Sequence, residues 1–226
     1  RSQRDWTNNV TILSGDVLAN DVGFSNNTEN VNHVVTTTTN SVLDGFVIRA
    51  GNADGTWPTP SCGGGGIYSV FPNFVLSNCI LFRNSAQYGG GIFNTAPITI
   101  RRCFLVDNKC AQQGGGMRDT SGTPCTLEEC VFSGNQASSG GGLATATRSA
   151  VLQRNVFAGN RATSGGGIYN LNLSSNTFRN CVLVGNSSLS GGGMTSQRGC
   201  AVLENCVVGY NRATSSGGGA IDGEMA

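Results

Sequence analysis

The sequence has few charged residues, a single lysine and a single histidine. Charged side chains make up 12% of the chain, and the formal net charge is +1. Nucleic acids and anionic membranes attract proteins through clustered basic residues, so this balance argues against both as partners. No apolar run reaches the length of about 20 residues that a membrane-spanning helix needs. The sequence therefore predicts no nucleic-acid partner and no membrane span.

The histidine, His33, has no nucleophile or carboxylate at a spacing typical of a catalytic group. General acid–base catalysis requires such partners within hydrogen-bonding reach. We therefore interpret His33 as a structural residue, and we find no cofactor motif in the chain.

Glycine, by contrast, is abundant, with 34 residues, and most of them form triplets followed by an apolar residue. The steps between the last glycines of successive triplets are 25, 25, 26, 25, 26 and 26 residues. A fixed period of this length is typical of a solenoid, in which repeats stack on one another. The triplets are residues 64–66, 89–91, 114–116, 140–142, 165–167, 191–193 and 217–219.

Six repeats can be aligned from Ile67 onward, and their conserved spacing defines columns. Five of the six repeats carry a cysteine at one position, where the remaining repeat has Asn155. Apolar residues stand three positions before and two positions after this position, and an asparagine stands five positions after it, in every repeat. The cysteine column consists of Cys79, Cys103, Cys130, Cys181 and Cys206. The asparagine ladder consists of Asn84, Asn108, Asn135, Asn160, Asn186 and Asn211.

These columns predict the fold. A helical repeat would not tolerate a glycine triplet in every unit, because each glycine costs a helix about 1 kcal/mol. Short apolar runs separated by glycine, asparagine and serine instead indicate three brief strands per rung of 25–26 residues, with equivalent residues stacked about 4.8 Å apart. The strong handedness preference of parallel crossovers favours a right-handed coil. We predict an all-β, right-handed parallel β-helix.

We expect one continuous domain with two parts. Residues 1–63 read as irregular first rungs, with β-rich runs at 11–16, 32–36 and 42–48 and a Pro/Gly surface loop at 52–62. Residues 64–226 read as regular repeats, and the incomplete last repeat leads us to expect a segment of a longer protein. Repeat length varies at one corner, so the segments 68–74, 118–124 and 170–175 should project there as the first place to look for a bound ligand.

Two recurring sequence elements carry a resemblance to a known family. Residues 132–135 and 157–160 read Phe-x-Gly-Asn, and Gly-Gly-Gly-Ile stands at 64–67, 89–92 and 165–168. These elements resemble the polymorphic outer-membrane-protein repeat, whose hallmarks are Gly-Gly-Ala-Ile and Phe-x-x-Asn, and the lead-in resembles large secreted β-helix proteins of bacteria. The resemblance implies a right-handed β-helix, secretion, and a surface or adhesive role, and it implies no active site.

The chain has nine cysteines, which leaves at least one unpaired within a single chain. We interpret the cysteine column as small buried apolar residues; the alternative is that stacked thiols bind a soft metal or bridge neighbouring rungs. The cysteines outside the column are disulfide candidates, because a secreted chain oxidises exposed pairs, with a connectivity that the sequence leaves open. They are Cys62, Cys110, Cys125 and Cys200.

Three acidic residues precede the second β-rich run. Asp16, Asp21 and Glu29 lie among several asparagines, and their oxygens are the hard ligands that Ca²⁺ prefers. The alternative is that they are solvated turn residues. Calcium is the one cofactor that the sequence leaves open.

Two function classes remain. The first is a non-catalytic, secreted or cell-surface solenoid that is structural or adhesive, that binds a surface glycan or protein, or that stacks end to end as a filament subunit through open strand edges. The alternative is a β-helix that binds or degrades polysaccharide. Such enzymes need clustered carboxylates, whereas Glu128 and Glu129 stand three rungs, about 14 Å, from Glu204.

Overall fold

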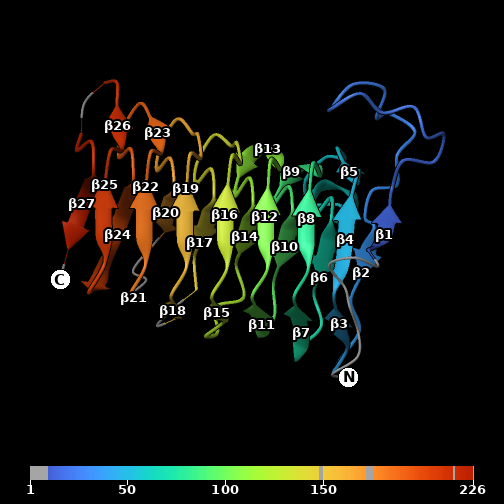
Figure 1. The fold of residues 1–226 in the computed structure, drawn as a ribbon, viewed down its shortest axis with the longest axis horizontal. Helices are drawn as coiled ribbons and strands as arrows, with labels where there is room; N and C mark the ends of the chain where they lie inside the picture. The colour runs from blue at the N-terminus through green and yellow to red at the C-terminus, as the bar shows by residue number, and fades with distance from the viewer. Residues whose placement is uncertain (1–9, 148–149, 172–175, 216, 226) are drawn as a thin grey trace.

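The computed structural model is a straight stack of parallel β-strand rungs, drawn with its long axis horizontal in Figure 1. It describes residues 10–147, 150–171, 176–215 and 217–225. Each regular rung turns through three strands and then rises to the next rung, so every strand pairs in parallel with its equivalents one repeat before and one repeat after. The prediction of an all-β parallel solenoid is confirmed.

One face is an eight-stranded sheet, which faces the reader in Figure 1. Its strands are β1 (Thr11–Ser14), β4 (Phe46–Arg49), β8 (Ile80–Phe82), β12 (Phe104–Val106), β16 (Val131–Ser133), β19 (Val156–Ala158), β22 (Val182–Val184) and β25 (Val207–Gly209).

The other two faces form one continuous sheet, because the long strand β24 belongs to both. The face that follows the glycine triplets contains β2 (Val35–Thr36), β6 (Ile67–Ser69), β10 (Ile92–Asn94), β14 (Met117–Asp119), β17 (Leu143–Thr145), β20 (Ile168–Leu171), β24 (Met194–Glu204) and β27 (Ile221–Met225). The remaining face contains β3 (Val42–Asp44), β7 (Phe74–Ser77), β11 (Ile98–Arg101), β15 (Thr126–Glu128), β18 (Val151–Gln153) and β21 (Thr177–Arg179).

A short fourth strand appears in some rungs at the corner before the glycine triplet. These strands are β5 (Asn52–Ala53), β9 (Ser85–Tyr88), β13 (Lys109–Gln113), β23 (Ser187–Ser188) and β26 (Arg212–Ala213). A 3₁₀ turn, η1 (Pro60–Cys62), lies in the proline-containing loop. Within the described ranges, the chain forms no helix that has both the length and the apolarity needed to cross a membrane.

The core is a set of stacked apolar columns inside the coil. In the eight-stranded sheet Leu105 pairs with Phe132, which pairs with Phe157, and all three are fully buried. The rings of Phe132 and Phe157 stack with their centroids 4.8 Å apart. Burying one such side chain contributes about 1.5–3 kcal/mol, so a single rung is not stable alone and neighbouring rungs stabilise one another.

The glycine triplets are explained by backbone crowding. The first glycine of a triplet has a positive φ, which is +75° at Gly114. A side chain on either of the other two glycines would strike the next rung, because a Cβ on Gly115 would lie 2.5 Å from the carbonyl oxygen of Gly141. Only glycine suits a corner at which successive turns of backbone approach this closely.

The two other corners each use one residue in the left-handed region. At one corner this residue directly precedes the column cysteine, as Glu129 (φ +56°) does. At the other corner it directly precedes the ladder asparagine, as Gly134 (φ +66°) does. The left-handed residue thus lies one position before each ladder asparagine, which leaves the asparagine side chain to point inward.

The lead-in forms the first rungs of the stack, since β1 pairs with β4, β2 with β6 and β3 with β7. The expected surface loop at 52–62 starts too early. Asn52 and Ala53 are buried and pair in parallel with Ser85 and Ala86 of β9. The prolines lie further along the chain and leave these two backbone donors free to pair.

Candidate functional site

The outer face of the eight-stranded sheet is apolar along its whole length. The middle residue of each strand points inward, so the residues beside it point outward and stack in columns. One outward column is entirely apolar, and Phe104 and Val207 in it are 42% and 62% exposed. Its members are Ile12, Val47, Ile80, Phe104, Val131, Val156, Val182 and Val207.

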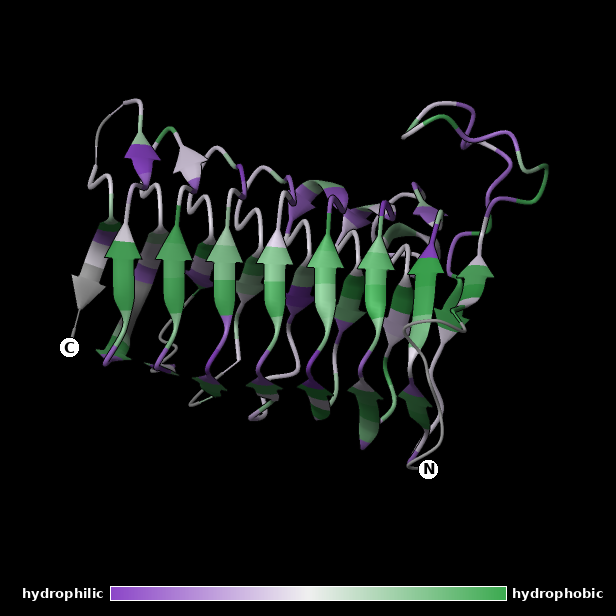
Figure 2. Ribbon diagram, viewed as in Figure 1, coloured by the Kyte–Doolittle hydropathy of each residue, from purple (hydrophilic) through white to green (hydrophobic). Residues whose placement is uncertain are grey.

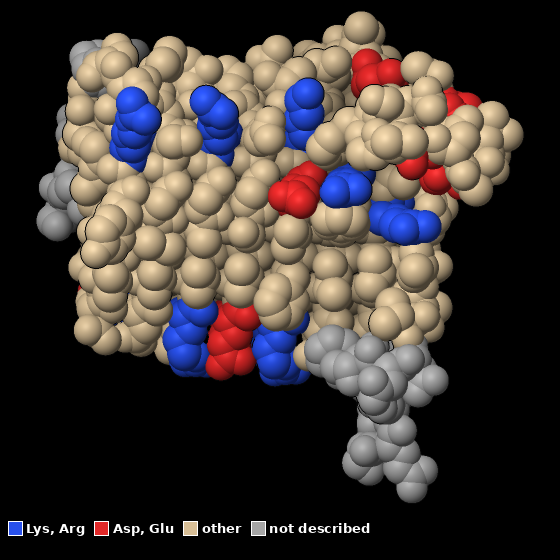
Figure 3. All heavy atoms as spheres, turned by 45° about the horizontal axis from the view of Figure 1, so that its top comes forward, with Lys and Arg blue, Asp and Glu red and all other residues tan. Residues whose placement is uncertain are grey.

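The second outward column extends the apolar surface. It contains Phe82, Val106, Ala158 and Val184, interrupted by Ser14, Ser133 and Gly209, and Arg49 is the one charged residue among these outward positions. Figure 2 shows the strands of this sheet coloured as hydrophobic, and Figure 3 shows charged side chains mainly along the margins of the face. We call this surface, defined by the two outward columns of β1 to β25, the apolar face.

The lower margin of the apolar face carries ion pairs. Glu128 accepts from Arg101 (3.3 Å) and from Arg154, while Arg154 also pairs with Glu129 at 2.9 Å. Glu204, three rungs away in register, pairs with Arg179 at 2.5 Å.

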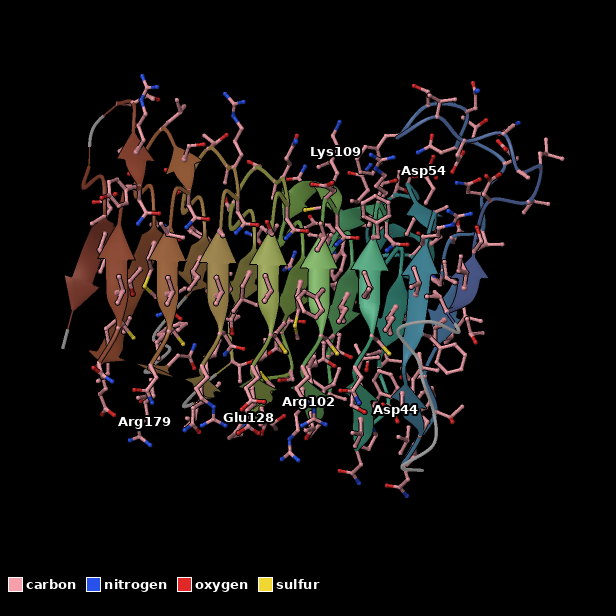
Figure 4. All side chains as sticks on the ribbon, viewed as in Figure 1. Asp44, Asp54, Arg102, Lys109, Glu128 and Arg179 are labelled. Atoms are coloured by element: carbon pink, nitrogen blue, oxygen red, sulfur yellow. The ribbon has the colours of Figure 1, made fainter. Side chains whose placement is uncertain are left out.

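Figure 4 shows Glu128 and Arg179 projecting from the same edge of the stack. Each of these glutamates therefore faces an arginine, and the carboxylates of Glu128 and Glu204 are not brought together. The exposed guanidinium of Arg179 has a raised pKa because Glu204 accepts a hydrogen bond from it.

The asparagine ladder is a continuous chain of buried amides. Asn135 donates through Nδ2 to the carbonyl of Leu105 (2.8 Å) and to Oδ1 of Asn160 (3.0 Å). Its own Oδ1 accepts from the backbone N–H of Asn108 (2.9 Å) and from Nδ2 of Asn108 (3.1 Å). The same pattern links every ladder residue from Asn84 to Asn211. The ladder thus satisfies corner N–H groups, such as that of Asn108, and adds a hydrogen bond to a strand carbonyl of the preceding rung.

The cysteine column occupies the equivalent place at another corner. The described column thiols are free, and each lies near two carbonyls, one in its own rung and one in the preceding rung, as Cys130 does with Glu128 (3.3 Å) and Ile100 (3.6 Å). Asn155 makes the same contact with Nδ2, at 2.9 Å from the carbonyl of Leu127, and its Oδ1 accepts from the N–H of Cys130. Asn155 therefore fits the column because it repeats the hydrogen bonding of the thiol.

Neighbouring column thiols influence one another. The neighbouring thiol of Cys103, as a hydrogen-bond partner of either one, lowers the pKa of Cys79 and of Cys130, whereas burial raises the pKa of Cys103 well above its ordinary value. Burial raises the pKa of Cys181 to about 11. Among the residues that the structure describes, the column thiols do not form a converging group of metal ligands. Such a group is formed instead by Asp16, Asp21 and Glu29, whose ligand oxygens lie within 4.8 Å of one another.

The cysteines outside the column differ from the expected exposed pairs. Cys62, Cys110 and Cys125 are buried free thiols, and the side chain of Cys200 lies outside the described part of the chain. Burial raises the pKa of Cys110 to about 12, and it also raises the pKa of Cys125, which lies beside Asp119. A thiol that does not ionise is a poor nucleophile, so these cysteines are unreactive in this arrangement.

His33 lies in an aromatic stack rather than in a catalytic group. Its ring stacks on Tyr68 with centroids 4.8 Å apart, and Tyr68 stacks on Phe93. Its Nδ1 lies 3.0 Å from the carbonyl oxygen of Gly64, and burial lowers its pKa. The guanidinium of Arg118 continues the stack, 6.0 Å from the Phe93 ring and 4.3 Å from that of Tyr88, and burial lowers the pKa of Arg118.

Sequence reasoning missed a buried polar column next to the variable corner. It lies two residues after each post-glycine position, and its members are Ser69, Asn94, Asp119, Thr145, Asn170 and Ser196. Asp119 accepts from Nδ2 of Asn94 (2.8 Å), from the N–H of Ser121 (3.2 Å) and from the hydroxyl of Thr147. These contacts anchor the loops that leave the coil here. Three variable segments were singled out from the sequence. Most of the third, 170–175, lies outside the described residues, which exclude 172–175.

Taken together, parallel rungs, an inward amide ladder and a flat outer sheet define a β-solenoid. The family described as "Right handed beta helix region" matches residues 98–224, more than half of the chain, so the chain belongs to this right-handed β-helix family. No curated protein and no solved structure matches it.

Proposed function

We propose that this chain is a non-catalytic, structural and adhesive β-solenoid, displayed on a cell surface or secreted, that binds a partner through the apolar face. The observation that carries the proposal is the unbroken outward apolar column of the eight-stranded sheet. Contiguous exposed apolar surface of this kind is typical of interaction sites. The resemblance to the polymorphic outer-membrane-protein repeat supports export and surface display.

The dimensions of the face favour weak contacts that act together. Eight strands at about 4.8 Å and about three residues per strand at 3.3 Å give roughly 38 by 10 Å, or about 400 Å². A standard protein interface covers about 800 Å² per partner. One face therefore binds weakly, and firm adhesion arises when many copies act together.

A protein surface is a better partner for this face than a glycan. The outward side chains are mainly valine, with isoleucine and phenylalanine, and offer no hydroxyl or amide group in the apolar column. Sugar hydroxyls buried against them would lose hydrogen bonds to water without gaining others. An apolar protein surface has no such penalty.

Adhesion can be tested with beads that carry many copies of the chain. Retention under flow is measured on a methyl-terminated monolayer and on a hydroxyl-terminated one. We expect strong retention on the methyl surface, and a loss of at least tenfold in the variant V131K/V182K. The matched control is T126K/T177K, which places the same two charges, also two rungs apart, on outward positions of another face. Equal retention of all three proteins would overturn the proposal, provided that circular dichroism shows each one folded.

End-to-end stacking into filaments is a second candidate, favoured by the register of the eight-stranded sheet. The strands β1 and β25 lie at its two ends, and both run parallel to every strand between them. The β25 edge of one copy can therefore pair with the β1 edge of the next in the same sense, which is a contact that propagates. Electron microscopy and light scattering over a concentration series test this. Filaments one subunit wide support it, and monomers at every concentration contradict it.

The rival polysaccharide enzyme has its own test. The glutamates that we had weighed as catalytic are each paired with arginine. Reducing ends or unsaturated products released from a panel of acidic and neutral polysaccharides would favour the enzyme and count against a purely adhesive role.

A further inference from the structure

The longest departure from the coil in the lead-in is the segment between β1 and β2, and it gathers acidic side chains. This segment leaves the stack after Ser14 and returns at Val35. Figure 1 shows it as the blue loop beyond β1, and Figure 3 shows acidic side chains on the same end of the molecule. It packs back on the rungs, since Asn52 donates through Nδ2 to the carbonyl of Asn27 at 3.0 Å. The loop is thus part of the folded structure.

The loop brings three carboxylates together. One oxygen from each of Asp16, Asp21 and Glu29 lies within 4.8 Å of the others, and all three residues are partly buried. Asp16 is oriented by the backbone, because Oδ1 accepts from the N–H of Asn20 (3.1 Å) and Oδ2 accepts from the N–H of Asp21 (3.3 Å). Three like charges at this separation repel one another unless a cation lies among them.

Buried oxygens without partners point independently to a missing ligand. Asn30 is 8% exposed and donates through Nδ2 to Oδ2 of Asp21 at 2.7 Å, which fixes its amide against the cluster. Its Oδ1 is buried and has no hydrogen-bond partner, and the same holds for Oδ1 of Asp21 and Oε1 of Glu29. A buried acceptor without a partner costs about 1–3 kcal/mol. Three residues therefore present buried oxygens that only a cation or water can satisfy.

The chain itself offers no such cation in the described residues. Arg49 lines a hollow beside Asp16 and Asp21, together with Arg83. The ion pairs formed within 4.0 Å in the described part of the chain involve Arg101, Arg154 and Arg179, and none reaches these carboxylates.

We propose that Asp16, Asp21, Glu29 and Asn30 form a Ca²⁺ site that fastens the β1–β2 loop to the first rungs. All four ligands are hard oxygen donors, as Ca²⁺ prefers. The three carboxylate oxygens lie within 4.8 Å of one another, and Ca²⁺ accepts irregular sets of about six to eight oxygen ligands. Mg²⁺ requires a near-ideal octahedron and gives up its waters reluctantly, so an irregular site of this kind favours calcium.

Isothermal titration calorimetry of the whole chain with CaCl₂ tests the site. We expect one ion per chain with a Kd of about 10⁻⁵–10⁻³ M, in the range of weak extracellular modules. Magnesium should bind at least tenfold more weakly. The variants Asp21→Asn and Glu29→Gln should each weaken Ca²⁺ binding at least tenfold, since each removes one charge and keeps the shape of the side chain.

The control is Asp107→Asn, which removes a carboxylate outside the cluster and should leave Ca²⁺ binding unchanged. A second readout is thermal unfolding, in which 5 mM CaCl₂ should raise Tm of the parent chain and of D107N but not of D21N. No heat and no Tm shift up to 10 mM CaCl₂ in a folded parent chain would overturn the proposal. Equal weakening by D107N and D21N would also overturn it, because the binding would then be diffuse.

Discussion

Two corners of the coil meet the same requirement with different side chains. At one corner each asparagine of the ladder uses both amide atoms, so that Asn135 has four hydrogen bonds to the rungs on either side. At the other corner a column cysteine such as Cys130 offers one weak donor to the carbonyl of Ile100, and the N–H of Cys103 points to its sulfur. At both corners one inward side chain therefore contacts a strand carbonyl of the preceding rung and accepts a corner N–H.

The difference shows in what each corner tolerates. The asparagine ladder is unbroken in all six regular repeats, whereas the cysteine column contains Asn155. A thiol hydrogen bond is weak, so replacing it loses little, while a missing amide leaves several buried groups without partners. The comparison teaches that both corners hold the rungs in register through inward hydrogen bonds, and that the amide corner does so more firmly than the thiol corner.

The largest effect should come from breaking the amide corner with Asn135→Ala. This change leaves the backbone N–H of Asn108 and one N–H of its side-chain amide buried and unpaired. At about 1–3 kcal/mol for each such group, we expect the free energy of unfolding to fall by about 4 kcal/mol. Urea unfolding followed by circular dichroism measures it. A loss below about 1 kcal/mol would contradict a role for the ladder in stability.

The second effect is a pH dependence that belongs to the cysteine corner alone, because amides do not titrate. The folded pKa of Cys181 is about 11, above its ordinary value of 9.0. Below pH 9 the thiol is protonated in both states and its full contribution is present. Between pH 9 and 11 the unfolded chain loses the proton first, so stability falls as the pH rises.

The expected loss through Cys181 is about 2–3 kcal/mol by pH 11, since one pKa unit corresponds to about 1.36 kcal/mol. Urea unfolding at pH 8 and pH 11, with a reductant present, measures it in the parent chain and in Cys181→Ala. The variant should lose less stability over this interval. Identical losses in the two proteins would mean that the buried thiol does not set the dependence.

A smaller effect should follow truncation at the thiol corner. Cys130→Ala removes one buried sulfur and its contact with the carbonyl of Ile100. We expect a loss of about 1–2 kcal/mol in the free energy of unfolding, from a small cavity and one weak hydrogen bond. The informative quantity is the ratio to Asn135→Ala in the same urea assay. If the two losses were equal, the two corners would be equivalent.

Much of the fold followed from the sequence because it depends on repetition. The glycine triplets and the column spacings fixed the rung length, the parallel pairing and the inward positions, as Leu105, Phe132 and Phe157 illustrate. Where repetition was lost, the prediction was weaker. Asn52 and Ala53 belong to a strand, because pairing with β9 overrides the nearby prolines.

The apolar face was present in the sequence and was not recognised. The residue directly after the cysteine column is apolar in every repeat, from Ile80 to Val207, and the next residue belongs to the inward Leu/Phe/Val column. Successive residues of a strand point to opposite sides, so both sides of this strand are apolar. The clustering of Asn30 with the carboxylates had no such signal, because the loop that brings them together does not repeat. Burial of Cys62 and Cys125 was likewise set by irregular segments, namely η1 and the loop before β15.

The smallest effect should come from exchanging the residue types at the thiol corner. In Cys130→Asn, the new Nδ2 would replace the thiol as donor to the carbonyl of Ile100, and the new Oδ1 would accept the N–H of Cys103. Asn155 already makes these two contacts one rung later, to Leu127 and Cys130. We expect a change of less than about 1 kcal/mol, because hydrogen bonds are gained while a slightly larger side chain must fit. A loss as large as that of Cys130→Ala in urea unfolding would mean that the thiol packing, and not the satisfied turn, is what this corner requires.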